Sequence, residues 1–364
     1  MKKGKLIYVA SAIIFISVAI IYSGCKKSSD PTAAAAQLTT VSQDKLFLSN
    51  SMTDISQCMS TLNSGDLATA FYGFTGLSNG TANNKVWMET LRDKLDNLVD
   101  FTSIYTPWKL NFSQSYGTYT WNQGSQTWTK TALSNQIVIN FPSSPAQSFN
   151  DCQMQLTQYS DNLYFINNDS VYLPTNLNCT LKRNQNTLFS LALQGSYNPT
   201  GFPCPQNLVV DMFCSPFNYH FTVTQLTPTQ FKATGSLQSL TGCETTFNVK
   251  ASFANNDFEQ FDVKQDLNNV IFDATKGDLS VSGSWDAHSY YSFINPSSTQ
   301  LNSTINFEVF YQSVKIGDLR FANVGNGNEL FVFYKDGTSE NSSIYHSPLV
   351  SDIKAMLTPY WGAL

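Results

Sequence analysis

Cysteines, histidines and acidic residues are the side chains with which this chain could carry out nucleophilic, redox or metal chemistry. The sequence has seven cysteines and three histidines. No two cysteines stand in a CxxC spacing and no two histidines in an HxxxH spacing, which excludes the usual zinc sites. The chain also lacks a GxSxG elbow, a phosphate-binding glycine-rich loop and an HExxH motif. The sequence therefore assigns no catalytic residue, no cofactor and no metal ligand, and it favours a protein that is not an enzyme.

The histidines His220, His288 and His346 are isolated from one another, and the acids are scattered along the chain. A lone histidine is more often a structural or surface residue than a catalytic one. A Ser–His or Cys–His site nevertheless stays open, because the members of such a site need not be adjacent in sequence. A pair of glycosidase carboxylates is likewise defined only by geometry.

Cys25 ends a segment that has the layout of a secretory signal peptide. Three lysines stand within the first five residues, and residues 6–22 form an apolar run interrupted by two serines. The run passes through Tyr-Ser-Gly directly into Cys25. This ending resembles the lipobox of bacterial lipoproteins, in which the cysteine is acylated and becomes the first residue of the mature chain. The resemblance implies a signal peptide over residues 1–24 and a lipidated Cys25.

An uncleaved N-terminal membrane helix is the alternative interpretation. Tyr22 stands where the lipobox usually has an aliphatic residue, and the apolar run of 17 residues is longer than the usual stretch of about 7–15. Both interpretations export the body of the chain and tether it to a membrane. Lys26 after Cys25 favours the outer membrane, by resemblance to the sorting rule of bacteria with two membranes. The lipid bilayer is therefore an expected partner, through acyl chains on Cys25.

The other six cysteines would face an oxidising compartment, where disulfides are expected. They are Cys58, Cys152, Cys179, Cys204, Cys214 and Cys243. Six cysteines allow 15 pairings, and the spacing alone does not choose among them. Prolines flank Cys204 in a stretch that is typical of a loop, so the sequence favours a Cys204–Cys214 bond.

Trp108, Trp121 and Trp128 gather around one predicted hairpin. If their rings share an exposed face, they could form a stacking platform for sugars. If the rings are buried, they are core anchors, which is the commoner fate of large apolar side chains.

The composition limits the partners of the exported chain. Residues 1–24 hold three lysines and no acid, so the remainder has 18 basic and 26 acidic side chains and a net charge of −8. Binding to nucleic acid needs clustered Lys and Arg, so this class is excluded. Aromatic residues reach 13% while charged residues are only 13%, a blend that favours half-buried strands.

Helices are predicted near both ends of the body. Residues 38–62 carry an apolar stripe of helical period, and residues 84–105 carry another that ends before Pro107. A third helix is expected over residues 347–357, with Pro348 in the first turn.

From residue 108 onward the apolar period changes from 3.6 to 2, which predicts strands. Residues 116–121 and 127–131 form a hairpin around a glycine-containing loop, and residues 136–141 form the next strand. The run GTYTWNQGSQTWTKTALSNQIVINFP at 117–142 resembles a hairpin element of exported bacterial lipoproteins that carries no known activity. Further strands are expected at residues 152–159, 170–173, 177–182, 188–197, 208–213, 219–226, 231–237, 245–253, 270–272, 279–285, 304–311, 317–324 and 330–334.

The predicted fold is α+β and mainly β. A large antiparallel meander, forming a curved sheet or half-barrel, is expected with two N-terminal helices and one C-terminal helix. Residues 25–37 read as a flexible tether, and residues 38–364 as a single domain. The proline-rich residues 198–205 are the one internal boundary that the sequence suggests.

Three functions are compatible with these patterns. The leading hypothesis is a membrane-anchored lipoprotein of the cell envelope that acts as a non-enzymatic binding or structural module. The second is a carrier or chaperone for an acyl-chain ligand, because a long curved sheet with helices over its open face resembles the periplasmic lipoprotein-carrier architecture. The third is a surface protein that binds or degrades glycans. The oligomeric state stays open.

Overall fold

The computed structural model of the chain describes residues 40–64, 90–91, 93–95, 111–133, 135–166, 169–239, 244–325, 327–345 and 347, with the backbone alone for residues 55–64 and 169. The predicted signal peptide, the tether, Cys25, Trp108 and Cys243 lie outside these residues, as does the side chain of Cys58. Among the described residues, no helix combines the length and the apolar character needed to cross a membrane.

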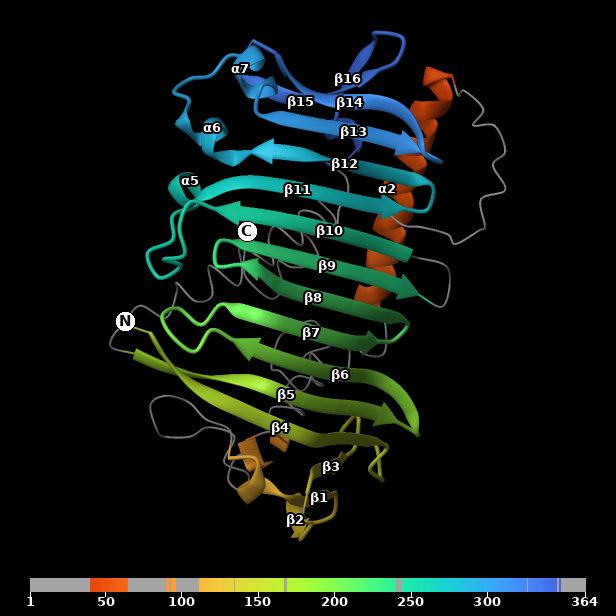
Figure 1. Cartoon of the computed structure of the whole chain (residues 1–364). Helices are drawn as coiled ribbons and strands as arrows, with labels where there is room; N and C mark the ends of the chain where they lie inside the picture. The colour runs from red at the N-terminus through yellow and green to blue at the C-terminus, as the bar shows by residue number, and fades with distance from the viewer. Residues whose placement is uncertain are drawn as a thin grey trace. The chain divides into compact units, whose positions relative to one another are not determined.

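In the described part of the chain, 16 strands form one mostly antiparallel sheet (Figure 1). From β3 to β16, strands that are neighbours in the sheet are also neighbours in sequence. At the other end the order is β3-β1-β2, and β1 pairs with β3 in parallel. The sheet is not closed, because β2 and β16 are its two terminal strands. The predicted mainly β meander is confirmed, and the parallel β1–β3 pair is a departure from it.

The chain divides into two compact units. Unit 1 is Met1–Met59 with Phe221–Ile353, and unit 2 is Ser60–His220 with Lys354–Leu364. The strands that lie wholly in unit 2 are β1 (Gly117–Asn122), β2 (Thr127–Thr131), β3 (Ile137–Phe141), β4 (Cys152–Ile166), β5 (Asp169–Arg183), β6 (Asn186–Tyr197) and β7 (Pro205–Cys214). The division falls within β8 (Phe217–Thr227). The strands of unit 1 are β9 (Gln230–Ser239), β10 (Glu244–Phe253), β11 (Leu267–Lys276), β12 (Leu279–Asp286), β13 (Ile305–Tyr311), β14 (Val314–Asn323), β15 (Asn328–Tyr334) and β16 (Ser339–Asn341).

The helix predicted over residues 38–62 is confirmed as α2 (Val41–Ser64). Of the helix predicted over residues 84–105, only residues 90–91 and 93–95 are described, and these are helical. The predicted C-terminal helix lies outside the described residues apart from Ser347. The sequence did not predict α5 (Val263–Asp266), α6 (Ala287–Ser292), α7 (Ser298–Asn302) or the 3₁₀ turn η1 (Ser113–Ser115). Elements this short do not complete enough turns to show a helical period.

The core of unit 2 forms around the β1–β2 hairpin, which folds as predicted. Trp121 and Trp128 lie directly opposite each other, with their ring centroids 5.4 Å apart in an edge-to-face arrangement. Leu91 and Leu95 of the helical residues pack into the same cluster. The core continues over β3 to β5 through buried aliphatic and aromatic side chains.

β5 is one strand where the sequence predicted two, separated at Pro174. The β5–β6 pairing stops at Asn176, whereas the β4–β5 pairing continues to Asp169. Pro174 therefore lies where β5 has a strand partner on one side only, and there the missing N–H interrupts no ladder. The hydroxyl of Tyr197, the last residue of β6, donates a hydrogen bond to the Pro174 carbonyl oxygen of β5 at 3.1 Å. This bond links β6 to β5 beyond the end of their strand pairing.

The strands of unit 1 have two chemically different faces. On β10 to β13, one face carries hydroxyl, amide and charged side chains together with the exposed Ile271 and the half-buried Phe310, and we call it the polar face. The other, the apolar face, carries Phe247, Val249 and Ala251 on β10, Val270, Phe272 and Ala274 on β11, Val281 and Trp285 on β12, and Phe307, Val309 and Tyr311 on β13. On the polar face, side chains of neighbouring strands form hydrogen bonds with one another. One example joins the hydroxyls of Thr246 on β10 and Thr275 on β11 at 2.6 Å. Strict alternation along each strand produces this separation.

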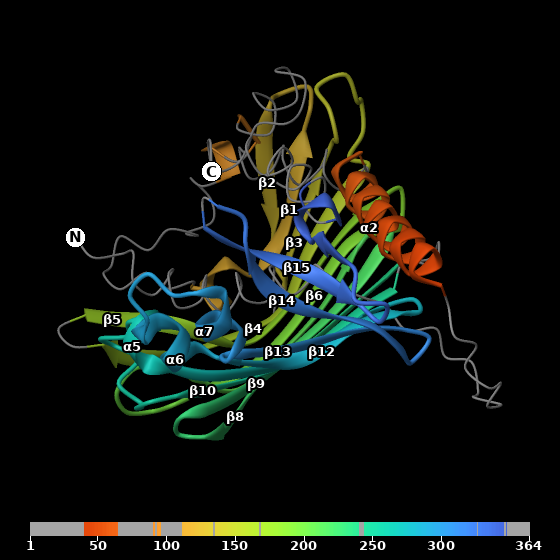
Figure 2. The same ribbon diagram turned by 90° about the horizontal axis from the view of Figure 1, so that it is seen from above.

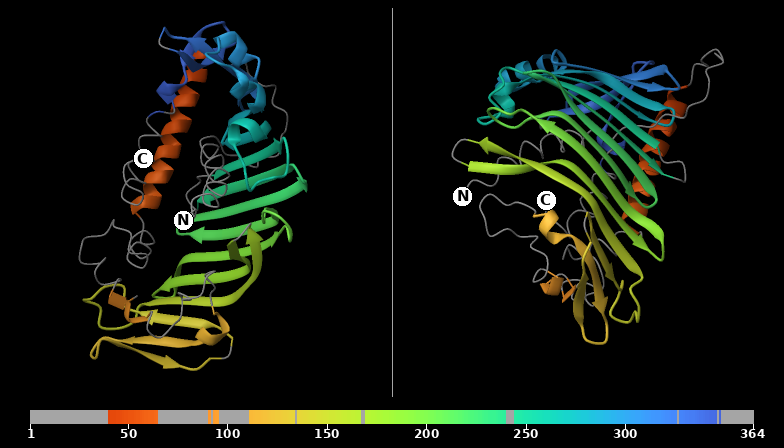
Figure 3. Two further views of the ribbon diagram at one scale, coloured as in Figure 1. Left: turned by 90° about the vertical axis from the view of Figure 1, so that its left-hand side faces the viewer. Right: turned by 60° about the horizontal axis from the view of Figure 1, so that its bottom comes forward.

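Helix α2 packs on the apolar face. Leu48 joins a buried cluster with Leu279, Val309 and Val332, and the Phe47 ring stacks on Tyr311 at 3.8 Å between centroids. The helix runs across the strands rather than along them (Figures 1 and 3). The short helices α5, α6 and α7 gather at the opposite end of the unit 1 strands from α2 (Figure 2).

Two glycines allow phenylalanine rings to lie flat on the apolar face. Gly235 is paired with Phe247 and Gly283 with Phe307. A Cβ at Gly235 would overlap the Phe247 ring, and a Cβ at Gly283 would overlap both the Phe307 ring and the backbone oxygen of Asn306. Each ring therefore covers the bare backbone of its neighbour, an arrangement known to compensate for glycine in sheets.

We expect Gly283→Ala to lower the free energy of unfolding by about 1–3 kcal/mol, because the added methyl group must displace backbone and ring atoms. The matched control is Gly124→Ala in the β1–β2 turn, where the nearest atom, Asn122 Oδ1, would lie at an ordinary contact distance of 3.4 Å. Denaturant unfolding of both variants measures the difference. Equal losses for the two substitutions would contradict this account of the Gly283–Phe307 pair.

Candidate ligand-binding face

Aromatic side chains on the apolar face of unit 1 remain half-exposed in the folded chain. Phe272 and Phe307 contact each other with their centroids 5.0 Å apart. Trp285 packs edge to face against Tyr290 and Tyr291 of α6, at 5.6 and 5.8 Å. Apolar surface that stays in contact with water is characteristic of a site that binds an apolar partner. These side chains form the best candidate for a binding surface among the described residues.

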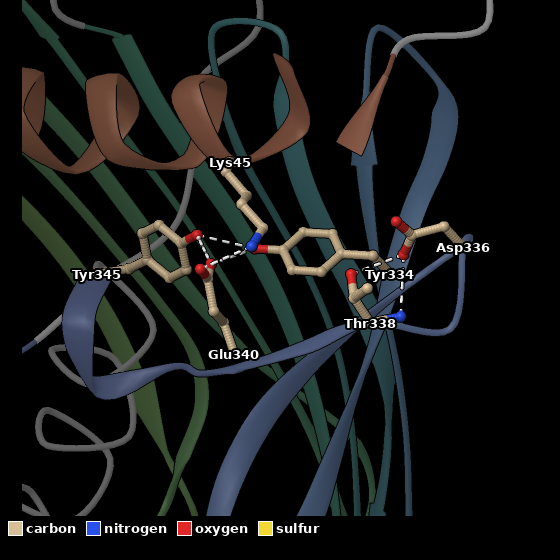
Figure 4. A network of polar contacts seen from close by, with 6 residues as sticks. All are labelled: Lys45, Tyr334, Asp336, Thr338, Glu340 and Tyr345. Carbon is tan, nitrogen blue, oxygen red and sulfur yellow. Dashed lines mark hydrogen bonds and ion pairs between the residues drawn. The ribbon is translucent and has the colours of Figure 1, made fainter. Parts of the chain in front are cut away.

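A polar network joins α2 to the β15–β16 hairpin beside this face (Figure 4). The Lys45 ammonium lies 2.7 Å from one carboxylate oxygen of Glu340. The hydroxyls of Tyr345 and Tyr334 donate to the other oxygen at 2.6 and 3.2 Å. A second ion pair joins the fully buried Asp44 of α2 to Lys335 at 3.2 Å. We call the contacts of Glu340 the α2 latch.

The protonation states of the α2 latch are fixed by its surroundings. Burial, together with the neighbouring Glu340 carboxylate, raises the pKa of Tyr345 far above its usual range. Burial is also the largest cause that raises the pKa of Tyr334, to about 12. Burial alone would raise the pKa of Glu340, but hydrogen bonds from Lys45 and Tyr345 outweigh it, so this pKa is lowered. At neutral pH the two phenols donate hydrogen bonds and the carboxylate accepts them. These charge-assisted contacts fix α2 to the β15–β16 hairpin.

Of the three tryptophans predicted around the first hairpin, the two that the structure describes, Trp121 and Trp128, do not form a stacking platform. Trp121 is 3% exposed and Trp128 is 8% exposed. The indole nitrogen of Trp128 donates to the Leu91 carbonyl oxygen at 3.0 Å, and the Lys94 ammonium lies 5.4 Å from the Trp121 ring centroid. The hypothesis of sugar stacking on these two rings is therefore wrong, because the helical residues 90–91 and 93–95 cover them. Trp108 lies outside the described residues.

The predicted Cys204–Cys214 disulfide is not formed, and both thiols are free. Cys204 precedes β7 and Cys214 is its last residue, so a whole extended strand separates them. At about 3.3 Å per residue this places their Cα atoms roughly 30 Å apart, far beyond the reach of a disulfide. The prediction that Cys204 lies in a loop is correct. The prediction overlooked that the chain from Pro205 to Cys214 is an extended strand.

The other two described cysteines, Cys152 and Cys179, are also free. Burial raises the pKa of Cys152 to about 12 and that of Cys179 to about 11. The same cause raises the pKa of Cys204 to about 12 and that of Cys214 to about 11. A protonated, buried thiol is a poor nucleophile, so these four residues act as small core side chains.

The described histidines and acids form no metal-binding group: no three His, Cys, Asp or Glu side chains of the described residues are arranged to hold an ion. His220 forms a half-exposed pair with Asp211, with 2.6 Å between Nδ1 and Oδ1. His288 is exposed on α6, and His346 lies outside the described residues. The pair is not joined by any hydrogen bond to a serine or cysteine side chain within the described part of the chain.

Sequence reasoning missed the α2 latch and the apolar face as sites. The partners in the latch, Lys45 and Glu340, are 295 residues apart, and nothing local to either indicates the other. The alternation of residues 245–253 and 279–285 was visible and could have shown which aromatic side chains share a face. It could not show that some of them stay half-exposed.

We expect Glu340→Gln to lower the free energy of unfolding by about 1–2 kcal/mol at pH 7, because a carboxylate that accepts three hydrogen bonds is lost. The folded pKa of Glu340 is depressed, so its contribution is present above the unfolded value of 4.5 and is lost as the pH falls through the folded pKa. The difference between the wild type and the variant should therefore disappear in acid.

Thermal unfolding between pH 3 and 8 measures this difference. The matched control is Glu308→Gln, which removes an exposed ion pair with Lys315 at 2.6 Å and should cost less than about 1 kcal/mol. If Glu340→Gln were as mild as the control at every pH, the α2 latch would not hold the helix.

Comparison with known proteins gives no relative from which a role could be transferred. No model of a protein family matches the chain, and neither a curated protein nor a solved structure matches it.

Proposed function

We propose that this chain is a lipid-anchored, non-enzymatic binding protein of the cell envelope, and that its ligand is a hydrophobic molecule with an acyl chain. The apolar face of β10 to β13 is the proposed binding surface. Cys25 is the proposed point of acylation, and the outer membrane is the proposed location. The proposal joins the leading sequence hypothesis, a tethered binding module, to its second one, a carrier of acyl chains.

The observation that carries the proposal is the half-exposure of aromatic side chains on one face of the sheet. Phe221, Phe272, Phe307 and Trp285 all keep part of their ring surface open. Covering apolar surface gains about 25 cal/mol per Å², and each buried CH₂ group of a ligand adds about 0.8 kcal/mol. An acyl chain lying across these rings would gain from both terms without needing specific hydrogen bonds.

The flat ring of Phe307 over Gly283 supports the same ligand class. The Phe307 ring is half-buried and replaces a protruding side chain by smooth aromatic surface, along which a flexible hydrocarbon chain can lie; the Phe247 ring over Gly235 is 8% exposed and belongs to the core.

The polar face of β10 to β13 carries two large apolar side chains, Ile271 and Phe310, among hydroxyl, amide and charged groups. Hydroxyl groups on this face bond to one another across the strands, as Thr222 does to Thr234. The glycan hypothesis, in contrast, loses two of the three tryptophans on which it rested, because Trp121 and Trp128 are buried.

The anchor is tested by Cys25→Ala in the full chain. The wild type should incorporate an alkyne-labelled fatty acid in growing bacteria and fractionate with membranes, whereas the variant should lose the label because its acceptor thiol is gone. Lys26→Ala serves as the matched control and should keep the label. Unchanged labelling of Cys25→Ala would refute acylation at this residue.

The binding surface is tested by photo-crosslinking of the full chain in phosphatidylcholine nanodiscs. A diazirine-bearing hexadecanoic acid should mark peptides of β10 to β13, because its chain would lie on the apolar face. Phe272→Gln should reduce the marking, whereas Ile271→Gln should leave it unchanged. These neighbours point to opposite faces of β11, and Ile271 is 49% exposed on the polar face.

Unfolding midpoints of both variants confirm that each is folded before labelling is compared. Labelling that is spread evenly over the chain, or that is equally sensitive to both substitutions, would argue against the apolar face as the site.

A further inference from the structure

Two adjoining turns of unit 1 carry exposed aliphatic side chains. Ile294, in the connection between α6 and α7, is 90% exposed, the largest exposed fraction of any large hydrophobic side chain in the described residues. Val324, in the turn between β14 and β15, is 41% exposed. The side-chain amide of Asn328 donates a hydrogen bond to the Pro296 carbonyl oxygen at 2.7 Å, so the two turns lie side by side. We call residues 293–296 with residues 324, 325 and 327 the tip, at the end of the strands where α6 and α7 gather (Figure 2).

Hydrogen bonds fix the backbone that presents Ile294 to the solvent. α7 begins with a capping box, in which the Ser297 hydroxyl accepts from the Gln300 backbone N–H at 3.3 Å and the Gln300 side chain accepts from the Ser297 backbone N–H at 3.0 Å. At the other end of α7, the Asn302 side chain bonds to the backbone oxygen and N–H of Phe321 at 2.9 and 2.6 Å. The outward position of Ile294 is therefore part of the folded structure.

A single exposed aliphatic side chain is ordinary on a protein surface, so Ile294 alone would carry no argument. The connection that holds it follows a cluster of half-exposed aromatic rings. Trp285, Tyr290 and Tyr291 pack edge to face on one another, and the Tyr290 ring also lies 6.3 Å from that of Phe321. Trp and Tyr combine an apolar ring with a polar group and are enriched where a membrane meets water.

The chain that forms the tip carries no lysine, arginine, aspartate or glutamate. None stands within residues 287–307 or within residues 321–328, where His288 is the one side chain that can gain charge near neutral pH. The acid before this segment, Asp286, accepts from the Ser289 backbone N–H at 3.0 Å, and Arg320 is paired with Asp318 at 2.9 Å. A charged side chain is costly to bring into lipid because it loses its water. The tip can approach lipid without this cost.

We propose that the tip docks into the interface of a phospholipid bilayer, with Ile294 and Val324 among the acyl chains and the neighbouring aromatic cluster near the head groups. This inference goes beyond the proposed function. It assigns a contact between the folded body and the membrane that is separate from Cys25 and from any ligand on the apolar face.

A bilayer fits this surface better than a protein partner does. A stable protein interface buries about 800 Å² on each side and surrounds an apolar centre with hydrogen-bonding groups. The tip instead offers two aliphatic side chains on neighbouring turns, with aromatic rings behind them. Insertion into a bilayer needs no matching partner groups, and a tethered chain meets the membrane at a high local concentration, so a weak contact is enough.

The position of the tip is tested by photo-crosslinking from the protein to lipid. The photoreactive amino acid p-benzoylphenylalanine replaces either Ile294 or Ile271 in the full chain, which is placed in nanodiscs of alkyne-tagged phosphatidylcholine. We expect at least about tenfold more lipid on the chain from position 294. Position 271 is the matched control, because Ile271 is also exposed, at 49%, but lies on the polar face.

A second experiment asks whether the two turns enter the bilayer together. With p-benzoylphenylalanine in place of Val324, Ile294→Asp should reduce lipid labelling about tenfold, because a carboxylate now resists insertion of the neighbouring turn. Ile271→Asp, on the polar face, should leave labelling from position 324 unchanged. Equal effects of the two substitutions would contradict docking through the tip.

The remaining outcomes separate this inference from the proposed function. Equal lipid labelling from positions 294 and 271 would refute docking of the tip, whereas acylation of Cys25 and labelling by the fatty-acid probe are decided by their own experiments. Crosslinks from position 294 to a second protein chain in place of lipid would also refute it. Before reconstitution, Ile294→Asp should keep the unfolding midpoint of the wild type, because the side chain it replaces is 90% exposed. A clearly lower midpoint would show that Ile294 supports the fold and would refute the inference.

Discussion

The alternation of side chains between the two faces of the unit 1 strands is the constraint on which the rest of this structure depends. A shift of one residue in the register of β10 or of β13 would bring the ring of Phe247 or of Phe307 to the polar face. The helix α2 would then lose the surface that Leu48 and Phe47 contact. Register, more than any single contact, keeps the aromatic surface continuous over several strands.

Several polar groups of the structure fix its shape by bonding to one another. The α2 latch uses its hydroxyls, carboxylate and ammonium on one another, and in unit 2 Asp151 is held by Ser143 and Arg183 in the same way. Burial raises the pKa of every described thiol, so these residues are packing groups.

Much of the fold could be predicted because its patterns are local. The hairpin at residues 116–131 shows alternation around a glycine-containing loop, and helix α2 shows an apolar stripe. The parallel pairing of β1 with β3 was not predicted, because it depends on which edge of the hairpin the next strand joins. The Cys204–Cys214 prediction failed because it judged closeness by sequence separation across what became a straight strand. For the site, the sequence indicated the half-buried strands but not the pairing of Lys45 with Glu340, which are brought together only by the whole of unit 1.

The order of the strands has a consequence for how such a chain can change its length. From β3 to β16 each strand pairs with its neighbours in sequence, so no pairing depends on a distant segment. A hairpin could be inserted or deleted as a pair of strands while the flanking strands keep their direction, and with it the side on which their side chains fall. A single added strand would reverse the direction of all later ones. Length variation in such a sheet is therefore expected in steps of two strands, each step widening or narrowing the aromatic surface without altering its chemistry.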